Sequence, residues 1–279
     1  MVGLLIGGYR RRPADNRRRG NRRDDPSMDG RGVRMIWVAS YPKSGSTWVR
    51  AFLANLLHGG AEPLRLQQIV DLWKVYHKDV GNLADGDMVR IHRLPHGLTI
   101  PPRTVYIVRD PRDVAVSWAA HYGVTISRAI RTLNSKEPMA PRADRVVTPP
   151  AKTADGSWSG HVKAWTKNTV VPSGLVMRYE TILGNRNGLA FNNLIASVLA
   201  PGFDRKQFAR AIDHSRFHEL QAQEDRDGFA ERPPSCKRFF RRGQAGGWRN
   251  VLTKPQARKI ETVNRAMMER FGYLDKSNE

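Results

Sequence analysis

The chain has 279 residues, which suits one large domain or two small ones around a sizeable core, and a single domain is the simpler interpretation. It carries 47 Lys and Arg against 26 Asp and Glu, a net charge of +21 that favours anionic partners, either a polyanion or a small molecule with several negative charges. One cysteine, Cys236, excludes an intrachain disulfide framework and fits a cytoplasmic location, and no apolar run approaches the roughly 18 residues of a membrane span.

Residues 1–34 contain ten arginines and four aspartates and have almost no apolar periodicity. Such a segment cannot bury enough apolar surface to offset the entropy lost on ordering, so we expect a disordered basic arm. A nucleic-acid-binding arm is the alternative, although arginines without interleaved aromatics lack stacking platforms for bases. The folded domain is therefore predicted to span 35–274, followed by a tail at 275–279.

The stretch 36–57 has the pattern of a strand, a tight loop and a helix. An apolar run at 36–39 leads into the loop, and apolar residues return at helical spacing from Trp48. The loop brings backbone N–H groups, hydroxyls, the positive end of the helix dipole and Lys43 into one small volume, which predicts a phosphate or sulfate site. It does not follow the Walker A order, because Lys43 precedes Gly45 by two positions. The alternative is an ordinary turn whose hydroxyls only cap the helix.

A second strand, loop and helix are predicted further along the chain. Residues 66–76 have short helical spacing, and the unbroken apolar run Thr104–Val108 is typical of a strand covered on both faces. Asp110 is the expected N-cap and Pro111 the expected first residue of a helix that ends near Tyr122. The pattern repeats the design of the first stretch.

The segment 125–156 contains four prolines and little periodicity, so we expect an irregular lid or acceptor loop there. Beyond it, the spacing predicts a buried strand at 174–179 and helices around 158–165, 187–199, 204–213 and 254–271. The last helix should begin with a capping box of Thr253 and Gln256 and bury Ile260, Val263, Met267 and Phe271. The alternation predicts a single-domain α/β fold with a P-loop-like, mainly parallel central sheet, helices on both faces and ligands at the carboxyl ends of the strands.

Four segments, in this order, resemble the soluble, cytosolic-type sulfotransferase family, which uses 3′-phosphoadenosine 5′-phosphosulfate (PAPS). They are SYPKSGSTW at 40–48, VRDPRDVAVSW at 108–118, RYE at 178–180 and FFRRGQAGGWRNVLT at 239–253. The first and second are similar to the family's 5′-phosphosulfate loop and 3′-phosphate motif. The resemblance spans residues 36 to about 271 and implies an enzyme that transfers the sulfuryl group of PAPS to a hydroxyl or amine of a small-molecule acceptor. It implies no metal.

The resemblance also implies a role for each matching residue. Lys43 would contact the oxygen that bridges phosphate and sulfate and offset charge on the leaving group, and Trp48 would stack on adenine unless it belongs only to the core. Ser117 is counted with Lys43 among the catalytic residues. The remaining residues implied to bind PAPS are Ser44, Gly45, Ser46 and Thr47 at the 5′-phosphate, Arg109, Ser117, Arg241, Arg242 and Gly243 at the 3′-phosphate, and Tyr179 at the adenine edge.

The acceptor needs a base, and VRIHRLP at 89–95 matches the position at which the family places a histidine. His92 is therefore the candidate base, with Arg90 in place of the family's usual lysine. His96 is the rival, because the extra Arg93 changes the spacing to the proline. His121 and His161 are weaker candidates for the acceptor side.

The chain departs from the family pattern in two places. Gly247 stands where an acidic residue is often found, and the region of the family's short dimer motif reads Thr253, Lys254 and Pro255. A homodimer is compatible with the sequence, but that mode of dimerisation is in doubt. A membrane or a specific nucleic acid is not an expected partner. Two other functions stay open: a Mg²⁺-dependent phosphotransferase on a P-loop-like sheet, and a non-enzymatic basic protein that binds nucleic acid or another polyanion.

Overall fold

The computed structural model describes residues 35–76, 83–84, 86–135, 156–167, 175–184 and 204–275. The expected arm at 1–34, the part of the expected loop at 136–155, the helix expected at 187–199 and the tail after 275 lie outside these ranges.

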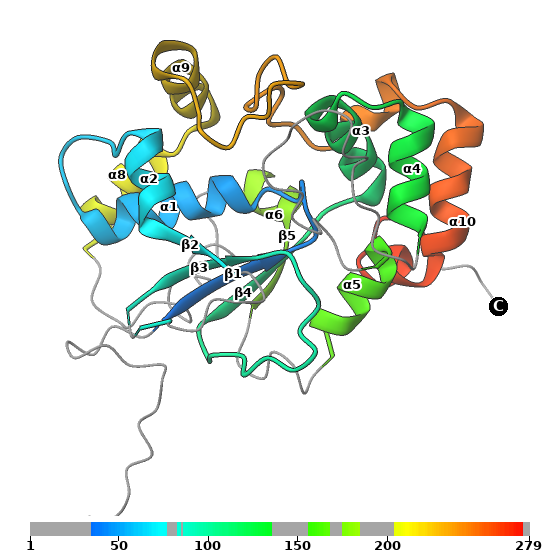
Figure 1. The fold of residues 1–279 in the computed structure, drawn as a ribbon, viewed down its shortest axis with the longest axis horizontal. Coiled ribbons are helices and arrows are strands. Elements are labelled where there is room, and N and C mark those ends of the chain that lie inside the picture. The colour runs from blue at the N-terminus through cyan, green and yellow to red at the C-terminus, as the bar shows by residue number, and fades with distance from the viewer. Residues whose placement is uncertain are drawn as a thin grey trace, which may run out of the picture.

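Five parallel strands form the central sheet, in the order β2-β3-β1-β4-β5 (Figure 1). The strands are β1 (Ile36–Ser40), β2 (Trp73–Val75), β3 (Met88–Ile91), β4 (Thr104–Val108) and β5 (Leu175–Arg178). In register, Ile36 of β1 lies opposite Met88, and Trp37 lies opposite Thr104. Both β1 and β4 are buried along their whole length, as unbroken apolar runs predict. The expected α/β class with a parallel sheet is confirmed.

Helices cover both faces of the sheet. Successive side chains of β1 point to opposite faces, so each face presents apolar residues that a helix can bury. Ile36 and Val38 pack with α1 in one hydrophobic cluster, whereas Trp37 and Ala39 pack with α3 and α5 in the other. The helices are α1 (Ser46–His58), α2 (Leu66–Leu72), α3 (Pro111–Tyr122), α4 (Ile126–Asn134), α5 (Trp158–Trp165), α6 (Tyr179–Gly184), α8 (Arg205–His214), α9 (Phe217–Asp227), the 3₁₀ turn η1 (Gly247–Asn250) and α10 (Lys254–Arg270).

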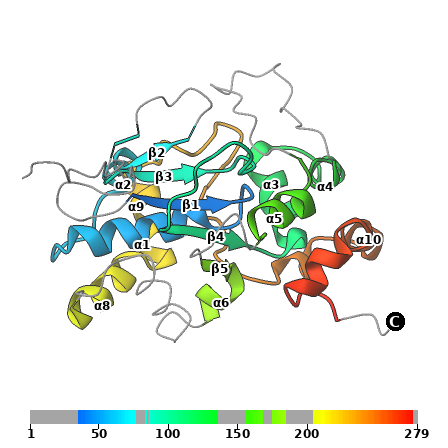
Figure 2. The ribbon, with the colours of Figure 1, turned by 90° about the horizontal axis from the view of Figure 1, so that it is seen from below.

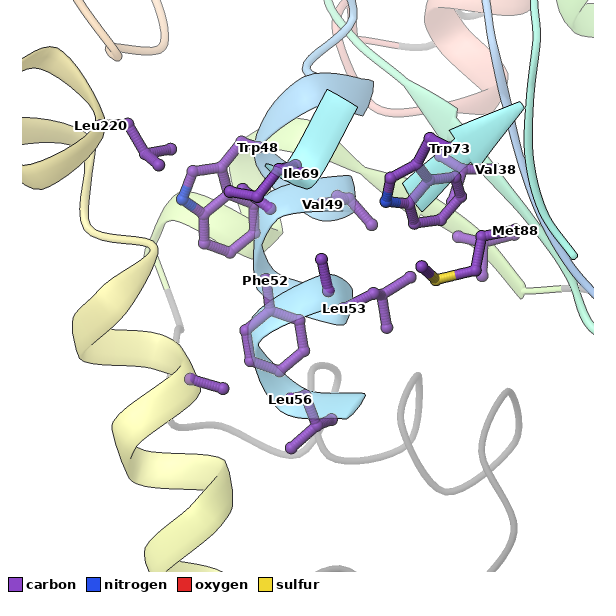
Figure 3. Packing of buried hydrophobic residues seen from close by; sticks show 14 of the residues in the cluster. Val38, Trp48, Val49, Phe52, Leu53, Leu56, Ile69, Trp73, Met88 and Leu220 are labelled. Atoms are coloured by element: carbon purple, nitrogen blue, oxygen red, sulfur yellow. The ribbon is translucent and has the colours of Figure 1, made fainter. Parts of the chain in front are cut away.

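The helices form two groups in space. Figure 1 shows α1, α2 and α8 gathered over one side of the sheet, and α3, α4 and α10 grouped together away from them. Figure 2 shows that the arrowheads of β3 and β4 point toward this second group, which also contains α5. In the first group, α1 supplies Trp48, Phe52 and Leu56 to a cluster that also contains Trp73 and Leu220 (Figure 3). None of the helices in the described ranges is both long and apolar enough to cross a membrane.

Two segments differ from the sequence-based expectation. The helical spacing at 66–76 holds only to Leu72, and the chain continues as β2, in which the aromatic and β-branched Trp73 and Val75 flank an exposed Lys74. The expected irregular segment at 125–156 begins instead with α4. The Thr125 hydroxyl caps α4 by accepting a hydrogen bond from the Arg128 N–H.

The capping box of Thr253 and Gln256 at the start of α10 is confirmed. The predicted buried stripe is wrong at Val263, which is 53% exposed, whereas the neighbouring Asn264 is buried. The amide of Asn264 explains this: its Nδ2 donates to Asn134 Oδ1 at 2.9 Å and its Oδ1 accepts from the Ser159 hydroxyl at 2.8 Å. A polar network across three helices therefore selects the face of α10 that is buried, with Ile260 on it.

Two truncations on α10 test this assignment. Ile260 has no exposed surface, so Ile260→Ala should lower the free energy of unfolding by about 2–5 kcal/mol through lost contacts and a residual cavity. Val263→Ala, the control on the same helix, should change it by no more than about 0.5 kcal/mol. Urea denaturation followed by circular dichroism measures both, and equal losses would show that the helix has the other orientation.

Candidate active site

Candidate site residues follow four of the five strands at the carboxyl edge of the sheet. The loop with Lys43 follows β1, His92 follows β3, Arg109 follows β4 and Tyr179 follows β5. Because the strands are parallel, these four ends lie along one edge, which is where ligands bind in open α/β sheets.

The loop after β1 leaves the start of α1 open to a ligand. Gly45 is the N-cap residue, with a left-handed φ of 97°, and no side chain in the described ranges caps the helix. The interpretation in which serine and threonine only cap this helix is therefore wrong. A Cβ at position 45 would also collide with the Tyr179 ring, so glycine is required both by conformation and by space. The N–H of Trp48 donates to the Gly45 carbonyl at 3.1 Å, whereas the N–H groups of Ser46 and Thr47, earlier in the first turn, are available for an anion.

Three side chains of this loop supply further contacts for an anion. The Ser44 hydroxyl is buried without a hydrogen-bond partner among the described residues. Thr47 Oγ1 accepts a hydrogen bond from Arg50 at 3.0 Å, which leaves its own hydrogen to donate. Lys43 Nζ lies 4.2 Å from the centre of the Phe239 ring, and burial lowers the pKa of Lys43 to about 7 although Glu231 acts in the opposite direction.

Arg109 contacts the three other segments that resemble a sulfotransferase. Its Nη1 donates to the carbonyl of Lys43 at 3.1 Å, and its Nη2 donates to the carbonyl of Gln244 at 3.0 Å. The guanidinium group lies 4.3 Å from the centre of the Tyr179 ring. Its Nε is buried and has no hydrogen-bond partner among the described residues. The four segments therefore meet at one cation.

The C-terminal segment is held in place by Asp113 on α3. Its Oδ2 accepts from the Gly246 N–H at 2.6 Å and its Oδ1 from the Trp248 N–H at 2.9 Å. Ser117, one turn further on, lies on the same face of α3 as Asp113. Sequence reasoning missed Asp113, because an acidic residue in the first turn of a helix is explained by the helix dipole alone.

Arg241, in the C-terminal segment, lies near enough to Arg242 and to Arg109 to be repelled by both. Burial, and then repulsion from Arg242 and Arg109, lowers the pKa of Arg241, so the three guanidinium groups share one positive region. Gly243 has φ 58°, and a Cβ there would collide with the ring of Phe217. Phe217, at the start of α9, was also missed, because its sequence context contains no signal that links it to residue 243.

His92 is held in one tautomer by the end of β1. Its Nδ1 lies 2.8 Å from the carbonyl oxygen of Ser40, and because a carbonyl only accepts, Nδ1 carries the hydrogen. Its Nε2 therefore has a free lone pair. Burial and the nearby Arg90 lower the pKa of His92 to about 3, which keeps the ring neutral. The rival, His96, is exposed.

Three further residues were expected at the site: Trp48, His121 and His161. They differ in burial and in hydrogen bonding. Trp48 is buried in the core, where its Nε1 donates to the carbonyl of Ser215 at 2.7 Å, and its contact with adenine stays a prediction. His121 is half-buried, and its Nδ1 has no hydrogen-bond partner among the described residues. His161 is fully buried, with both ring nitrogens hydrogen-bonded.

A buried ion cluster that sequence reasoning missed lies beside the first loop. Glu231 binds Arg50 with both carboxylate oxygens, at 2.7 and 3.0 Å, and also binds Arg90 at 2.9 Å. Although burial opposes it, the two arginines lower the pKa of Glu231 to about 2. The cluster joins α1, β3 and the segment that leads to Phe239. In the ranges that the structure describes, no group of three or more His, Cys, Asp or Glu could hold a metal ion.

Comparisons with known proteins agree with this geometry. A family model described as the sulfotransferase domain matches residues 34–272. Cytosolic sulfotransferase 16 of Arabidopsis thaliana is 26% identical over 273 residues, covering 86% of this chain and 78% of that protein. Sulfotransferase 1B1 of Canis lupus familiaris is 25% identical over 260 residues, covering 84% and 83%.

Two solved structures share the fold. Retinol dehydratase in complex with androsterone and the inactive cofactor PAP gives a TM-score of 0.58 at 18% identity, with 84% of this chain and 80% of that chain covered. Mouse sulfotransferase SULT7A1 complexed with PAP gives 0.56 at 18% identity, with 86% and 88% covered.

Removing Glu231 tests the ion cluster. Arg50 is 1% exposed, so Glu231→Ala should lower the free energy of unfolding by about 3–5 kcal/mol by leaving a buried charge without its partner. Asp225→Ala, which breaks an exposed pair with Arg238, should cost about 1 kcal/mol or less. Chemical denaturation compares the two, and a small effect at Glu231 would mean that water or another group replaces the carboxylate.

Proposed function

The chain belongs to the sulfotransferase domain family, and we propose that it transfers the sulfuryl group of PAPS to a hydroxyl or amine of a small molecule, with His92 as the base. The observation that carries the proposal is the position of Arg109, which follows β4 and links an anion-binding helix start after β1 to the arginines of the C-terminal segment, Arg241 and Arg242. PAPS carries negative charge at its 5′ end and at its 3′-phosphate. A nucleoside triphosphate has no 3′-phosphate and gives the second group no role.

The residues at the two ends suit the two charged groups. At the 5′ end, the N–H groups of Ser46 and Thr47 in the first turn of α1 and the hydroxyls of Ser44, Ser46 and Thr47 would donate hydrogen bonds. The 3′-phosphate would bind Arg109 and Ser117 together with Arg241, Arg242 and the Gly243 N–H. Charge-assisted hydrogen bonds of this kind each contribute roughly 1.5–3 kcal/mol. Tyr179, packed between Gly45 and Arg109, and Trp48 would contact adenine. Two structural neighbours solved with PAP support this assignment.

Transfer needs a stabilised leaving group and an activated acceptor. Lys43 would offset the negative charge that develops on the phosphate oxygen as its bond to sulfur breaks. His92 Nε2, which carries a lone pair because Nδ1 donates to Ser40, would take the acceptor's proton while the bond from the acceptor oxygen or nitrogen to sulfur forms. Products are the sulfated acceptor and 3′-phosphoadenosine 5′-phosphate (PAP).

The acceptor and the cellular setting are proposed at a coarser level. We assign residues 35–274 to the catalytic domain and the segment 125–156, which begins with α4, to the acceptor side. Neighbours named as binding androsterone and retinol support a small organic acceptor for this chain. A relative named a cytosolic sulfotransferase, together with the single cysteine, supports a cytoplasmic location.

Calorimetric titration tests the proposed co-substrate. The protein with chelator present should bind PAP much more tightly than AMP or ATP, and a random DNA duplex should not compete. Arg241→Ala should weaken PAP about 10- to 100-fold and leave AMP unchanged, because AMP lacks the 3′-phosphate. Lys237→Ala, another exposed cation in this part of the chain, is the control. Equal affinity for ATP and PAP, or a requirement for Mg²⁺, would refute the proposal.

The pH dependence of PAP binding tests Lys43. Its pKa is lowered to about 7 in the free protein, and a bound polyanion favours the charged form, so binding should take up a proton. The affinity for PAP should therefore fall as pH rises from 7 to 9, by at most about tenfold per pH unit. Lys43→Met should abolish this fall. Titrations in buffers of different ionisation enthalpy measure the proton uptake, and a wild-type affinity that is constant over this range would contradict the lysine's role.

A further inference from the structure

A chain of hydrogen bonds runs through the core to the backbone of His92. The Tyr106 hydroxyl lies 2.9 Å from Nδ1 of His161, and Nε2 of His161 lies 3.2 Å from the carbonyl oxygen of His92. Nδ1 of His92 then lies 2.8 Å from the carbonyl oxygen of Ser40. Tyr106 and His161 have no exposed surface, so water does not compete with these bonds.

Each proton in this chain has one position. Carbonyl oxygens only accept, so His161 carries its hydrogen on Nε2 and must accept at Nδ1, where the Tyr106 hydroxyl donates. The backbone of Tyr41, in the loop after β1, partly offsets the effect of burial on the pKa of this hydroxyl. Burial lowers the pKa of His161 to about 4 and raises that of Tyr106 well above its usual range, so both groups stay neutral. His161 has no free nitrogen and is not itself a base for the acceptor.

The contact matters because β3 ends at Ile91, so His92 lies just outside the strand. Two residues one turn apart on α5 hold the chain there: His161 donates to the carbonyl of His92, and Trp165 Nε1 donates to the carbonyl of Arg93 at 2.7 Å. The His161 ring itself is fixed by its neighbours, with the Tyr41 ring edge-on at 5.5 Å between centroids. Two consecutive carbonyls are therefore clamped by side chains of a helix more than 60 residues away in sequence.

We propose that His161 is a positioning residue. Held by the Tyr106 hydroxyl, it donates to the carbonyl of His92 and so fixes the backbone from which His92 presents its unprotonated Nε2 to the acceptor. The inference rests on the proposed function in one respect, because it takes His92 as the base. Efficient proton transfer requires the base to be oriented within hydrogen-bond reach of the acceptor's proton. A loosened backbone at His92 should therefore lower the rate of the chemical step without changing the binding of the nucleotide.

Two substitutions at one position separate hydrogen bonding from packing. The side-chain amide of His161→Gln can donate to the His92 carbonyl and accept from Tyr106, whereas His161→Leu fills similar space and can do neither. Tyr106→Phe removes only the hydroxyl that fixes the tautomer of His161. Thermal unfolding and calorimetry with PAP provide the controls for folding, and all three variants should bind PAP within about threefold of the wild-type affinity.

The deciding measurement is the ¹⁵N NMR spectrum of the histidine side chains in the full chain with PAP bound, which requires no acceptor. In the wild type and His161→Gln, His92 should give a single tautomer with its hydrogen on Nδ1 from pH 5.5 to 8. In His161→Leu it should give mixed tautomers or titrate within this range. An unchanged His92 spectrum in His161→Leu would overturn the proposal.

Turnover gives an independent readout. With PAPS and 2-naphthol as a phenol probe, His161→Leu should lower kcat about 10- to 100-fold with the KM for PAPS nearly unchanged, and His161→Gln should restore most of the rate. A wild-type kcat in His161→Leu would also overturn the proposal. A wild-type kcat in His92→Ala is a different failure: it would remove His92 as the base, while the NMR result for His161 would still stand.

Discussion

The candidate site depends on how Arg109 is held. Its two hydrogen bonds go to backbone carbonyls, those of Lys43 and Gln244, and its flat face stacks on Tyr179. Carbonyl dipoles and an aromatic face orient a guanidinium group without cancelling its charge. The fold therefore fixes the position of this cation without a salt bridge among the described residues, although Asp113 and Glu180 lie near enough to interact with its charge, and the same side chain joins segments that are more than 60 residues apart.

The other arginines near the site differ in this respect. Arg112 pairs with Asp110 and Glu261, and both Arg50 and Arg90 pair with Glu231. Those charges are neutralised where they lie, and their loss would affect folding before it affected binding. Arg241 and Arg242 have no carboxylate partner among the described residues, and they lie on the exposed side of the positive region around Arg109. The pairing pattern thus separates structural arginines from those available to an anion.

The strands β1, β4 and β5 and the loops that follow β1 and β4 could be predicted because their signals are local, whereas β3, which leads to His92, was not predicted. An apolar run followed by hydroxyls, glycine and a cation specifies β1 and its loop without any other part of the chain. Glu231 and Asp113 could not be identified, and His161 was expected only on the acceptor side, because each acts through a partner that is distant in sequence, such as Arg50 for Glu231. For the same reason Asn264 was not among the residues expected to be buried: its hydrophobicity alone does not indicate burial, which depends on its hydrogen bonds with Asn134 and Ser159.

Burial affects the protonation states of Lys43 and His92, the two groups proposed to take part in the transfer. It lowers the pKa of both Lys43 and His92, so the lysine is partly neutral near pH 7 and the histidine fully so. A bound polyanion restores the positive charge of Lys43 more readily than that of His92, because the pKa of Lys43 is about 7 and that of His92 is about 3. Arg90 adds to this difference by disfavouring a proton on His92. Binding of the nucleotide would therefore charge the lysine at the leaving group while the histidine stays neutral, so burial, Arg90 and the bound polyanion together would set the two protonation states that the transfer needs.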